Sequence, residues 1–338
     1  MHQYIDRRTG LVRNEKLIAD SWIQFLYSTI REDAPALFRM ATSRRSTALL
    51  GWLNYDLPLV GRWTGNRPFL LGQGFRLDEC LDRWEEMRTL RALFERRIRY
   101  WECRPMPEAD SVVVAPSDSR MLHGSFVEGT ALFLKGKFFD LAALLGHDRP
   151  QWIERFARGD WAIFRLTPEQ YHYNHLPVTG RVLDHYDLEG ACHACNPTAI
   201  VQEVTPFSQN GRAVTILDTE GPGGSQLGLV AMIEVVAMMI GEVEQRYSEV
   251  RYDHPRTITP GDWLERGCPK SLFRPGSSTV VLLFEPDQVL FDDDLRANQH
   301  RTDVHSRFSE GLGRTLVETE VTVRSRIAVR RMGGVDEG

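Results

Sequence analysis

Hydrophobic residues in the first third of the chain recur at helical spacing. Between residues 15 and 30 an apolar side chain stands at every fourth position, at Ile18, Trp22, Leu26 and Ile30. Residues 77–101 repeat apolar side chains at steps of three or four, among many arginines and glutamates. Because such steps place side chains on one face of an α-helix, both segments are predicted to be amphipathic helices. We therefore expect residues 1–105 to form a mainly helical region.

The arginines near residue 100 allow two interpretations. Arg96, Arg97 and Arg99 stand beside Tyr100 and Trp101. Arginine mixed with glutamate on a helix is usually a solvated face with pairs between neighbouring turns. A basic and aromatic helix end is also typical of a segment that lies on a membrane surface. The pattern leaves both interpretations open.

The spacing changes near residue 106, where short β-type runs begin, separated by clusters of Gly, Pro, Asn and Asp. The runs cover residues 111–115, 161–166, 212–217, 227–236, 279–284 and 317–327. The last run alternates apolar and polar residues with period two, as a half-buried strand does. Residues 227–244 are apolar for so long that they fit either a strand or a helix. Helices followed by strands predict an α+β fold, with a β-rich barrel-like or sandwich-like domain over residues 106–338.

Composition excludes several classes of protein. The 338 residues are 42% hydrophobic and 26% charged, as in a soluble globular protein. A net charge of −5 argues against a nucleic-acid partner. The chain has no apolar run long enough to span a membrane, and its first residues lack the apolar core of a signal peptide. Five cysteines fit a reducing compartment better than a disulfide framework, so we expect a cytoplasmic protein.

Three segments carry residue types that together activate a nucleophile. Asp118 follows a β-type run, His172 and His175 stand three apart, and residues 276–279 (Gly-Ser-Ser-Thr) precede the apolar run from Val280. In such a set the Asp orients an imidazole, the His takes a proton, and a serine hydroxyl attacks. Each segment alone also fits a structural role. Asp118 could simply form a turn, the two histidines could be partly buried structural residues, and residues 276–279 could be a turn before a core strand.

Two further motifs carry weaker signals. Residues 192–195 have the spacing of a CxxC metal motif, and His185 and Cys268 could complete it, but no second CxxC exists. Residues 221–224 are rich in glycine but lack the Lys-Ser/Thr of a phosphate-binding loop. We predict a hairpin loop at residues 221–224 and no metal site.

The order of these motifs resembles that of the phosphatidylserine decarboxylase family. That family carries a Pro-x-Asp-Gly turn, then a Tyr-His-x-x-His-x-Pro segment, then a Gly-Ser-Thr or Gly-Gly-Ser-Thr cleavage site before an apolar strand. This chain has matching segments at residues 4–10, 115–118, 135–145, 171–177 and 273–284. Each motif is short, but their order is specific and the resemblance extends over nearly the whole chain.

The resemblance implies an enzyme that makes its own cofactor. His175, oriented by Asp118, would deprotonate the cleavage-site serine, whose hydroxyl attacks the preceding carbonyl. The chain would split into a large N-terminal β chain and a short C-terminal α chain, which stay together as a heterodimer. The serine that begins the α chain would become a pyruvoyl group, which binds the substrate amine and accepts electrons as carbon dioxide leaves.

The resemblance also implies the substrate and the place of reaction. Phosphatidylserine would be converted to phosphatidylethanolamine, with His172 aiding decarboxylation or protonating the carbanion. The protein would be a lyase of phospholipid biosynthesis that associates peripherally with a membrane, and the helical region over residues 1–105 would face the lipid.

Several positions depart from the family pattern. Ser119 replaces the Gly after the Asp, residues 234–237 (Glu-Val-Val-Ala) replace Val-Gly-Ala, and residues 269–272 replace Glu-x-Gly. The cleavage site allows two registers. Ser278 fits the flanking residues on both sides, whereas Ser277 would keep Gly on the acyl side of the broken bond, where strain costs least. The flanks favour Ser278, and both registers stay open.

Three other functions remain compatible with the sequence. A pyruvoyl enzyme of the same kind could act on a free amino acid. Asp118, His175 and Ser277 or Ser278 could form a serine hydrolase that does not cut itself, although no Gly-x-Ser-x-Gly elbow surrounds the serine. A β-barrel binding module without enzymatic activity would leave the chain intact.

Overall fold

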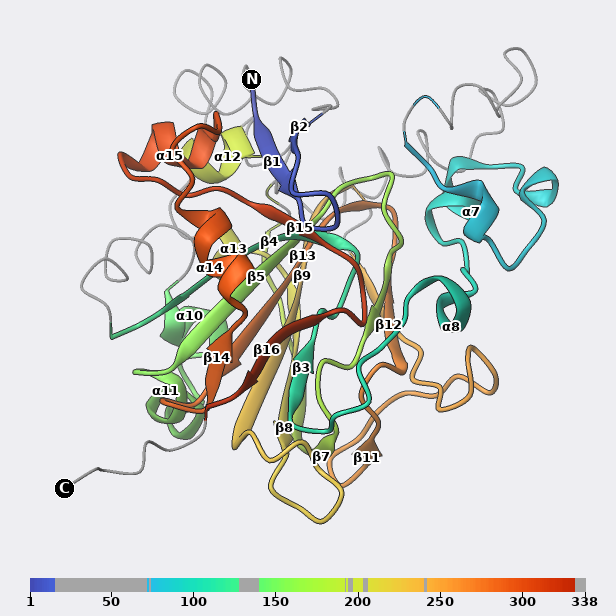
Figure 1. The fold of residues 1–338 in the computed structure, drawn as a ribbon. Helices are drawn as coiled ribbons and strands as arrows, with labels where there is room; N and C mark the ends of the chain where they lie inside the picture. Colours follow the sequence, from blue (N-terminus) through green and yellow to red (C-terminus); the bar gives the residue numbers. More distant parts are fainter. Residues whose placement is uncertain are drawn as a thin grey trace.

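A large β-sheet forms the centre of the molecule (Figure 1). The computed structural model describes residues 1–15, 72, 74–127, 140–191, 193, 197–202, 206–239 and 242–331. The sheet has ten strands, in the spatial order β11 (Trp263–Leu264), β7 (Gly180–Leu188), β8 (Arg212–Asp218), β9 (Leu229–Met239), β13 (Gly276–Phe284), β5 (Asp160–Leu166), β4 (Ser119–Ser125), β15 (Thr319–Val321), β1 (Gln3–Asp6) and β2 (Val12–Asn14). Neighbouring strands are antiparallel except β1 and β15.

Two three-stranded sheets cover one face of the large sheet. Their strands are β10 (Val243–Gln245), β12 (Pro269–Phe273) and β6 (Tyr173–His175) in one, and β14 (Val289–Phe291), β16 (Arg326–Arg330) and β3 (Val112–Val114) in the other. Side chains of both small sheets share one hydrophobic core with Val280, Leu282 and Phe284 of β13. The sheets therefore form a sandwich, and the large sheet does not close into a barrel.

Short helices cover the opposite face of the large sheet. They are α10 (Leu141–Leu145), α11 (Pro150–Phe156), α12 (Pro197–Gln202), α13 (Pro206–Gln209) and α15 (Arg307–Leu312), and their apolar side chains pack with Val281 and Leu283 of β13. Because side chains alternate along a strand, β13 is buried on both faces, which explains its continuous apolar sequence. A further helix, α14 (Asp293–Gln299), follows β14. None of the described helices is long and apolar enough to cross a membrane.

The long helix predicted over residues 77–101 does not form. The segment contains the 3₁₀ helices η2 (Leu77–Glu79) and η3 (Trp84–Glu86), then α7 (Leu90–Phe94) and α8 (Tyr100–Cys103). The chain folds back on itself, because Cys80 and Ile98 form a β-bridge and the Arg97 side chain pairs with Asp82 at 2.5 Å. These long-range contacts hold the segment folded back on itself. The predicted pairs between neighbouring turns still form within its short helical pieces, as between Arg91 and Glu95 and between Arg99 and Glu102.

Two other parts of the N-terminal prediction also need correction. Residues 3–14 form strands β1 and β2 of the large sheet instead of helix. Arg96 is buried and donates hydrogen bonds to the carbonyl oxygens of Glu169 and Gln170, so its side chain does not face a lipid surface. The helix predicted from residue 15 to 30 lies outside the described residues apart from Glu15.

Most of the predicted strands form. Residues 227–244, which fitted either structure, contain strand β9 and the start of β10. The run 317–327 is two strands, because Arg324 takes a left-handed backbone conformation, φ +70°, between β15 and β16. Residues 221–224 lie in the connection between β8 and β9, as predicted. Residues 276–279 form the start of β13 rather than a turn before it.

Candidate active site

Ser278 lies near the start of the central strand of the sandwich. It is buried and pairs with Leu166 of β5 and Val236 of β9. On the β9 side the register shifts at this point, because Gly276 pairs with Met239 and Ser278 with Val236. Two steps along β13 thus face three steps along β9. The irregular pairing falls on Ser277 and the peptide bonds around it, where the ladder with β9 is locally disrupted.

His172 lies beside the segment that leads into β13. Its carbonyl oxygen accepts a hydrogen bond from the backbone N–H of Phe273, at 3.1 Å. Its imidazole is fully buried and stacks on the ring of Phe94 from α7, with centroids 3.5 Å apart. Among the residues that the structure describes, neither ring nitrogen reaches a hydrogen-bond partner in good geometry. Burial, and then the charge of Arg96, hold the pKa of His172 well below its usual range, so the ring is neutral.

His175 is held by hydrogen bonds at both ring nitrogens. Its Nδ1 lies 2.8 Å from the carbonyl oxygen of Gly267, which only accepts, so Nδ1 carries the proton. Burial lowers the pKa of His175 to about 3, and the ring is neutral at pH 7. Nε2 therefore presents a lone pair, which the Tyr171 hydroxyl contacts at 3.0 Å. That hydroxyl lies 2.7 Å from the hydroxyl of Tyr252.

Asp118 does not contact the His175 ring, contrary to the role predicted from the sequence. Its carboxylate accepts two hydrogen bonds from Arg104, at 2.9 and 2.6 Å, and one from the backbone N–H of Val323. Burial opposes ionisation of Asp118, but the Arg104 charge outweighs it and lowers the pKa. The two segments do meet through the backbone, since the N–H of His175 donates to the carbonyl of Pro116 at 2.7 Å. The Gly267 carbonyl, rather than Asp118, orients the imidazole.

A buried ion pair supports the strand that carries the histidines. Lys270 of β12 and Glu234 of β9 are both fully buried, with Nζ 2.6 Å from Oε2. Asn174, between the two histidines, donates to Oε1 of Glu234 at 3.1 Å and to Oγ of Ser271 at 3.0 Å. In the sequence, residues 234 and 270 stand out only as departures from the family pattern. A glutamate inside an apolar strand was the available signal for this cluster.

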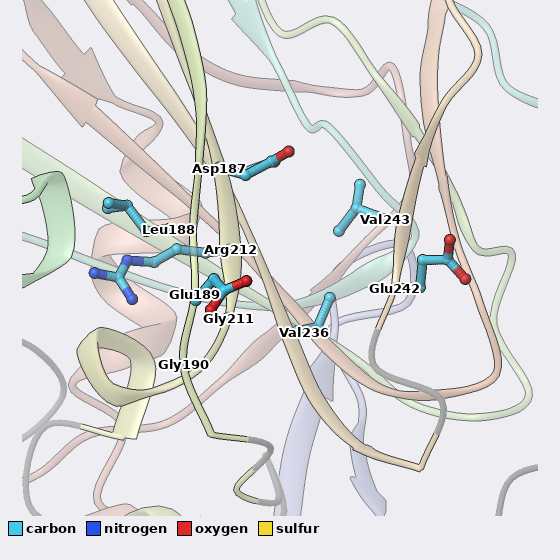
Figure 2. Close-up of a pocket in the computed structure, with 10 residues that line it drawn as sticks. Asp187, Leu188, Glu189, Gly190, Gly211, Arg212, Val236, Glu242 and Val243 are labelled. Carbon is cyan, nitrogen blue, oxygen red and sulfur yellow. The ribbon is translucent and has the colours of Figure 1, made fainter. Parts of the chain in front are cut away.

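A cavity opens beside Val236, the residue of β9 that pairs with Ser278. Its volume is about 290 Å³, and Figure 2 shows the residues that line it, namely residues 187–190, 211–213, 236, 242 and 243. The Arg212 guanidinium points away from Val236 and donates to the carbonyl oxygens of Leu144 and Asn210. The charged side chains left at the rim are Asp187, Glu189 and Glu242, which favour a cationic group such as a substrate ammonium.

A family model described as phosphatidylserine decarboxylase matches residues 90–314. The match contains Asp118, both histidines and both candidate serines. The chain belongs to the phosphatidylserine decarboxylase family. A phosphatidylserine decarboxylase proenzyme from Chlamydia trachomatis serovar D is 28% identical over 294 residues, which cover 86% of this chain and 90% of the relative.

Eukaryotic members of the family match over a smaller part of their own length. Phosphatidylserine decarboxylase proenzyme 2 of Oryza sativa subsp. japonica is 33% identical over 230 residues, 67% of this chain and 34% of the relative. Proenzyme 3 of Schizosaccharomyces pombe is 29% identical over 298 residues, 87% of this chain and 29% of the relative. The family assignment thus rests on bacterial, plant and yeast relatives, all carrying the word proenzyme in their names.

Proposed function

We propose that this protein is a pyruvoyl-dependent phosphatidylserine decarboxylase that matures by cutting its own chain before Ser278. The observation that carries the proposal is the position of Ser278, buried at the start of β13 where the pairing with β9 becomes irregular. The family match supplies the reaction class, a carboxy-lyase. The relatives' name supports a precursor that is processed.

In the proposed maturation the serine hydroxyl attacks the carbonyl carbon of Ser277. The peptide C–N bond breaks and an ester links the two parts of the chain. Loss of the α-proton of residue 278 then breaks the ester bond, which leaves a carboxylate on Ser277 and dehydroalanine at 278. Water replaces the nitrogen, ammonia leaves, and a pyruvoyl group caps residues 278–338. His175 accepts a proton at Nε2, the nitrogen that the Gly267 carbonyl leaves unprotonated, and the Tyr171 hydroxyl, which contacts Nε2, passes the serine proton to it.

The surrounding residues fit a pyruvoyl group at position 278. The group supplies a carbonyl that binds the substrate amine and accepts electrons when carbon dioxide leaves. His172 is a neutral, buried imidazole whose nitrogens lack good partners in the described part of the chain, and such unsatisfied groups often mark a reaction site. In our proposal this ring delivers the proton to the substrate carbon. The acidic rim beside Val236 attracts the substrate ammonium.

The intact mass of the purified protein tests the maturation. We expect two chains, residues 1–277 and 278–338, with the shorter one carrying the mass of an N-terminal pyruvoyl group. The variant Ser278→Ala should remain a single chain, whereas Ser277→Ala should still be cut. Cleavage of Ser278→Ala with pyruvoyl one residue earlier would assign the reaction to Ser277. A wild-type protein that is active as one uncut chain would refute the proposal.

The substrate needs a separate test, because a free amino acid would use the same cofactor. We expect release of carbon dioxide from phosphatidylserine in vesicles and none from free serine. Release from free amino acids alone would show that the protein keeps the cofactor but not the lipid substrate. In that case the proposed peripheral association with a membrane would also lose its support.

A further inference from the structure

A second cavity lies at the end of the sandwich opposite to Ser278. Its volume is about 320 Å³, and it is lined by the ends of β4 and β5, by β14 and by residues in and after α14. Asp160, in its wall, pairs with Phe284 at the far end of β13, whereas Leu166 pairs with Ser278. Six strand positions separate the two ends, roughly 20 Å at about 3.3 Å per residue. The cavity is therefore distinct from the candidate active site.

The lining of this cavity is basic although the whole protein is acidic. Arg296, Arg314, Arg331 and His300 line it, against one acidic residue, Asp160, in a chain with net charge −5. Arg296 pairs with Asp293, and Arg331 pairs with Asp287 at 3.1 Å. Both aspartate side chains are more than four-fifths exposed to solvent. Ion pairs exposed to this degree are weak, so both guanidinium groups remain able to bind an anion.

His123 is a fixed polar group in the wall of the cavity. Its backbone N–H donates to Oε1 of Gln299 and its carbonyl accepts from Nε2 of Gln299, both at 2.9 Å. Its ring stacks on Phe291, with centroids 4.5 Å apart. The residue is 7% exposed, and its buried Nε2 has no hydrogen-bond partner in the described residues. A buried nitrogen without a partner is costly, and a bound ligand would satisfy it.

We propose that this cavity binds the phosphate group of an organic phosphate. Arginine side chains match phosphate oxygens in charge and geometry. Phosphate can form a hydrogen bond with Nε2 of His123 in either tautomer of the ring. Its oxygens accept if Nε2 carries the proton, and the hydroxyl of the monoanion donates if Nε2 does not. Val289, Leu290 and Phe291 offer apolar contacts to the rest of the ligand.

The site joins both sides of the proposed cut. His123 and Asp160 precede Ser278 in the chain, whereas the three arginines follow it. A bound phosphate would therefore link the two chains of the mature protein at the end away from the active site. The proposal goes beyond the decarboxylation and uses none of its residues.

Binding of two probes tests the site and identifies the source of the phosphate. Inorganic phosphate is titrated by calorimetry at constant ionic strength, set with sodium chloride. Vesicles of phosphatidylcholine, with and without phosphatidic acid, are tested by cosedimentation. We expect saturable binding of at least one probe, by the cut protein and by the uncut Ser278→Ala chain. Binding of phosphate identifies a dissolved ligand, and binding of phosphatidic acid vesicles alone identifies a lipid headgroup.

Matched variants assign the binding to the cavity. We expect the double variant Arg296→Gln/Arg331→Gln to bind at least tenfold more weakly, and His123→Phe, which keeps the stacking on Phe291, to bind several-fold more weakly. Arg256→Gln removes an arginine of similar exposure that does not line the cavity, and it should bind like the wild type. If His123→Phe does not fold, the arginine variant decides alone. Absence of binding to both probes, or equal binding by the arginine and control variants, would overturn the proposal.

Discussion

The protonation state of His175 is decided by single atoms around it. The Gly267 carbonyl fixes the proton on Nδ1, and burial keeps the ring neutral. Nε2 carries no hydrogen, so the Tyr171 hydroxyl is the donor in their 3.0 Å contact, and the Tyr252 hydroxyl in turn donates to Tyr171 at 2.7 Å. The one hydrogen of Tyr171 is therefore directed to Nε2. A base with a defined tautomer exists here without any contact to a carboxylate.

Removing the Tyr171 hydroxyl should slow self-cleavage. In Tyr171→Phe the lone pair of His175 loses the hydroxyl that passes the serine proton to it, and a neutral hydrogen bond of about 0.5–1.5 kcal/mol corresponds to roughly a 2- to 13-fold change in rate. The measurement is the intact mass of newly synthesised chain against time. Tyr173→Phe is the control, because Tyr173 stacks on Tyr171 but does not contact His175 through its hydroxyl. Equal rates for the two variants would contradict the role of Tyr171.

Replacing His172 should separate maturation from decarboxylation. In His172→Phe the ring can still stack near Phe94 but cannot transfer a proton, so the chain should be cut while carbon dioxide release falls about 10²-fold or more. Intact mass reports the first step and product formation the second. Decarboxylation at the wild-type rate in a fully cut His172→Phe protein would exclude His172 from proton transfer.

At the scale of elements, Glu234 and Lys270, which both depart from the family pattern, contact each other. Glu234 lies on β9 and Lys270 on β12, 36 residues apart in the chain, yet they form a buried ion pair between the large sheet and a small sheet. Burial opposes ionisation of Glu234, but the Lys270 charge outweighs it and lowers the pKa. The pair and Asn174 together fix β6, which contains His175 and begins directly after His172, against the strand next to Ser278.

Breaking this ion pair should destabilise the protein strongly. Lys270→Met leaves the Glu234 carboxylate buried without its cation, and we expect a loss of about 3–5 kcal/mol in the free energy of unfolding. The double variant Lys270→Met/Glu234→Gln removes both charges and should recover most of the loss. Arg246→Met breaks a half-buried pair with Glu244 and should cost below about 1 kcal/mol. Urea unfolding of the uncut Ser278→Ala chain measures all three, and similar losses for Lys270→Met and Arg246→Met would contradict the prediction.

The elements differ in how well their sequences predict them. Strands β5, β8 and β13 lie close to their predicted bounds, because their continuous apolar runs are buried on both faces of the sheet. The segment over residues 77–101 has a helical repeat of apolar residues but forms four short helical pieces. Its arginines make local pairs with glutamates but also bind distant groups, such as the Cys80 and Gln170 carbonyls. Helical periodicity alone carries no information about such partners.

At the scale of the whole molecule, buried histidines make stability depend on pH. Burial lowers the pKa of His175 to about 3 and of His123 to about 4, and it also lowers the pKa of His172 and His185. Unfolded histidines titrate near pH 6.5. Below that pH the unfolded chain binds protons that the folded chain does not, so stability is complete above about pH 6.5 and is lost as the pH falls.

The expected slope between pH 6 and pH 5 is about 1.4 kcal/mol per pH unit for each of His175 and His123, whose pKa values of about 3 and about 4 lie below this range. Urea unfolding of the uncut Ser278→Ala chain at several pH values measures this slope. His123→Phe should reduce it by the contribution of one histidine. Carboxylates with lowered pKa, such as Asp118, act in the same direction but only at lower pH. A stability that stays constant from pH 7 to pH 5 would contradict the burial of these rings as neutral groups.

The sequence by itself determined the family and the central strand, and it named the candidate residues of the proposed reaction. Those features depend on residue type and order along the chain, as in the apolar run after Ser278 and the Tyr-His-x-x-His-x-Pro segment. Only the tertiary structure decided the partners of each group: Gly267 and Tyr171 for His175, Arg104 for Asp118, Lys270 for Glu234. Each partner lies on another element, and which polar group a buried side chain contacts depends on how the sheets and helices pack.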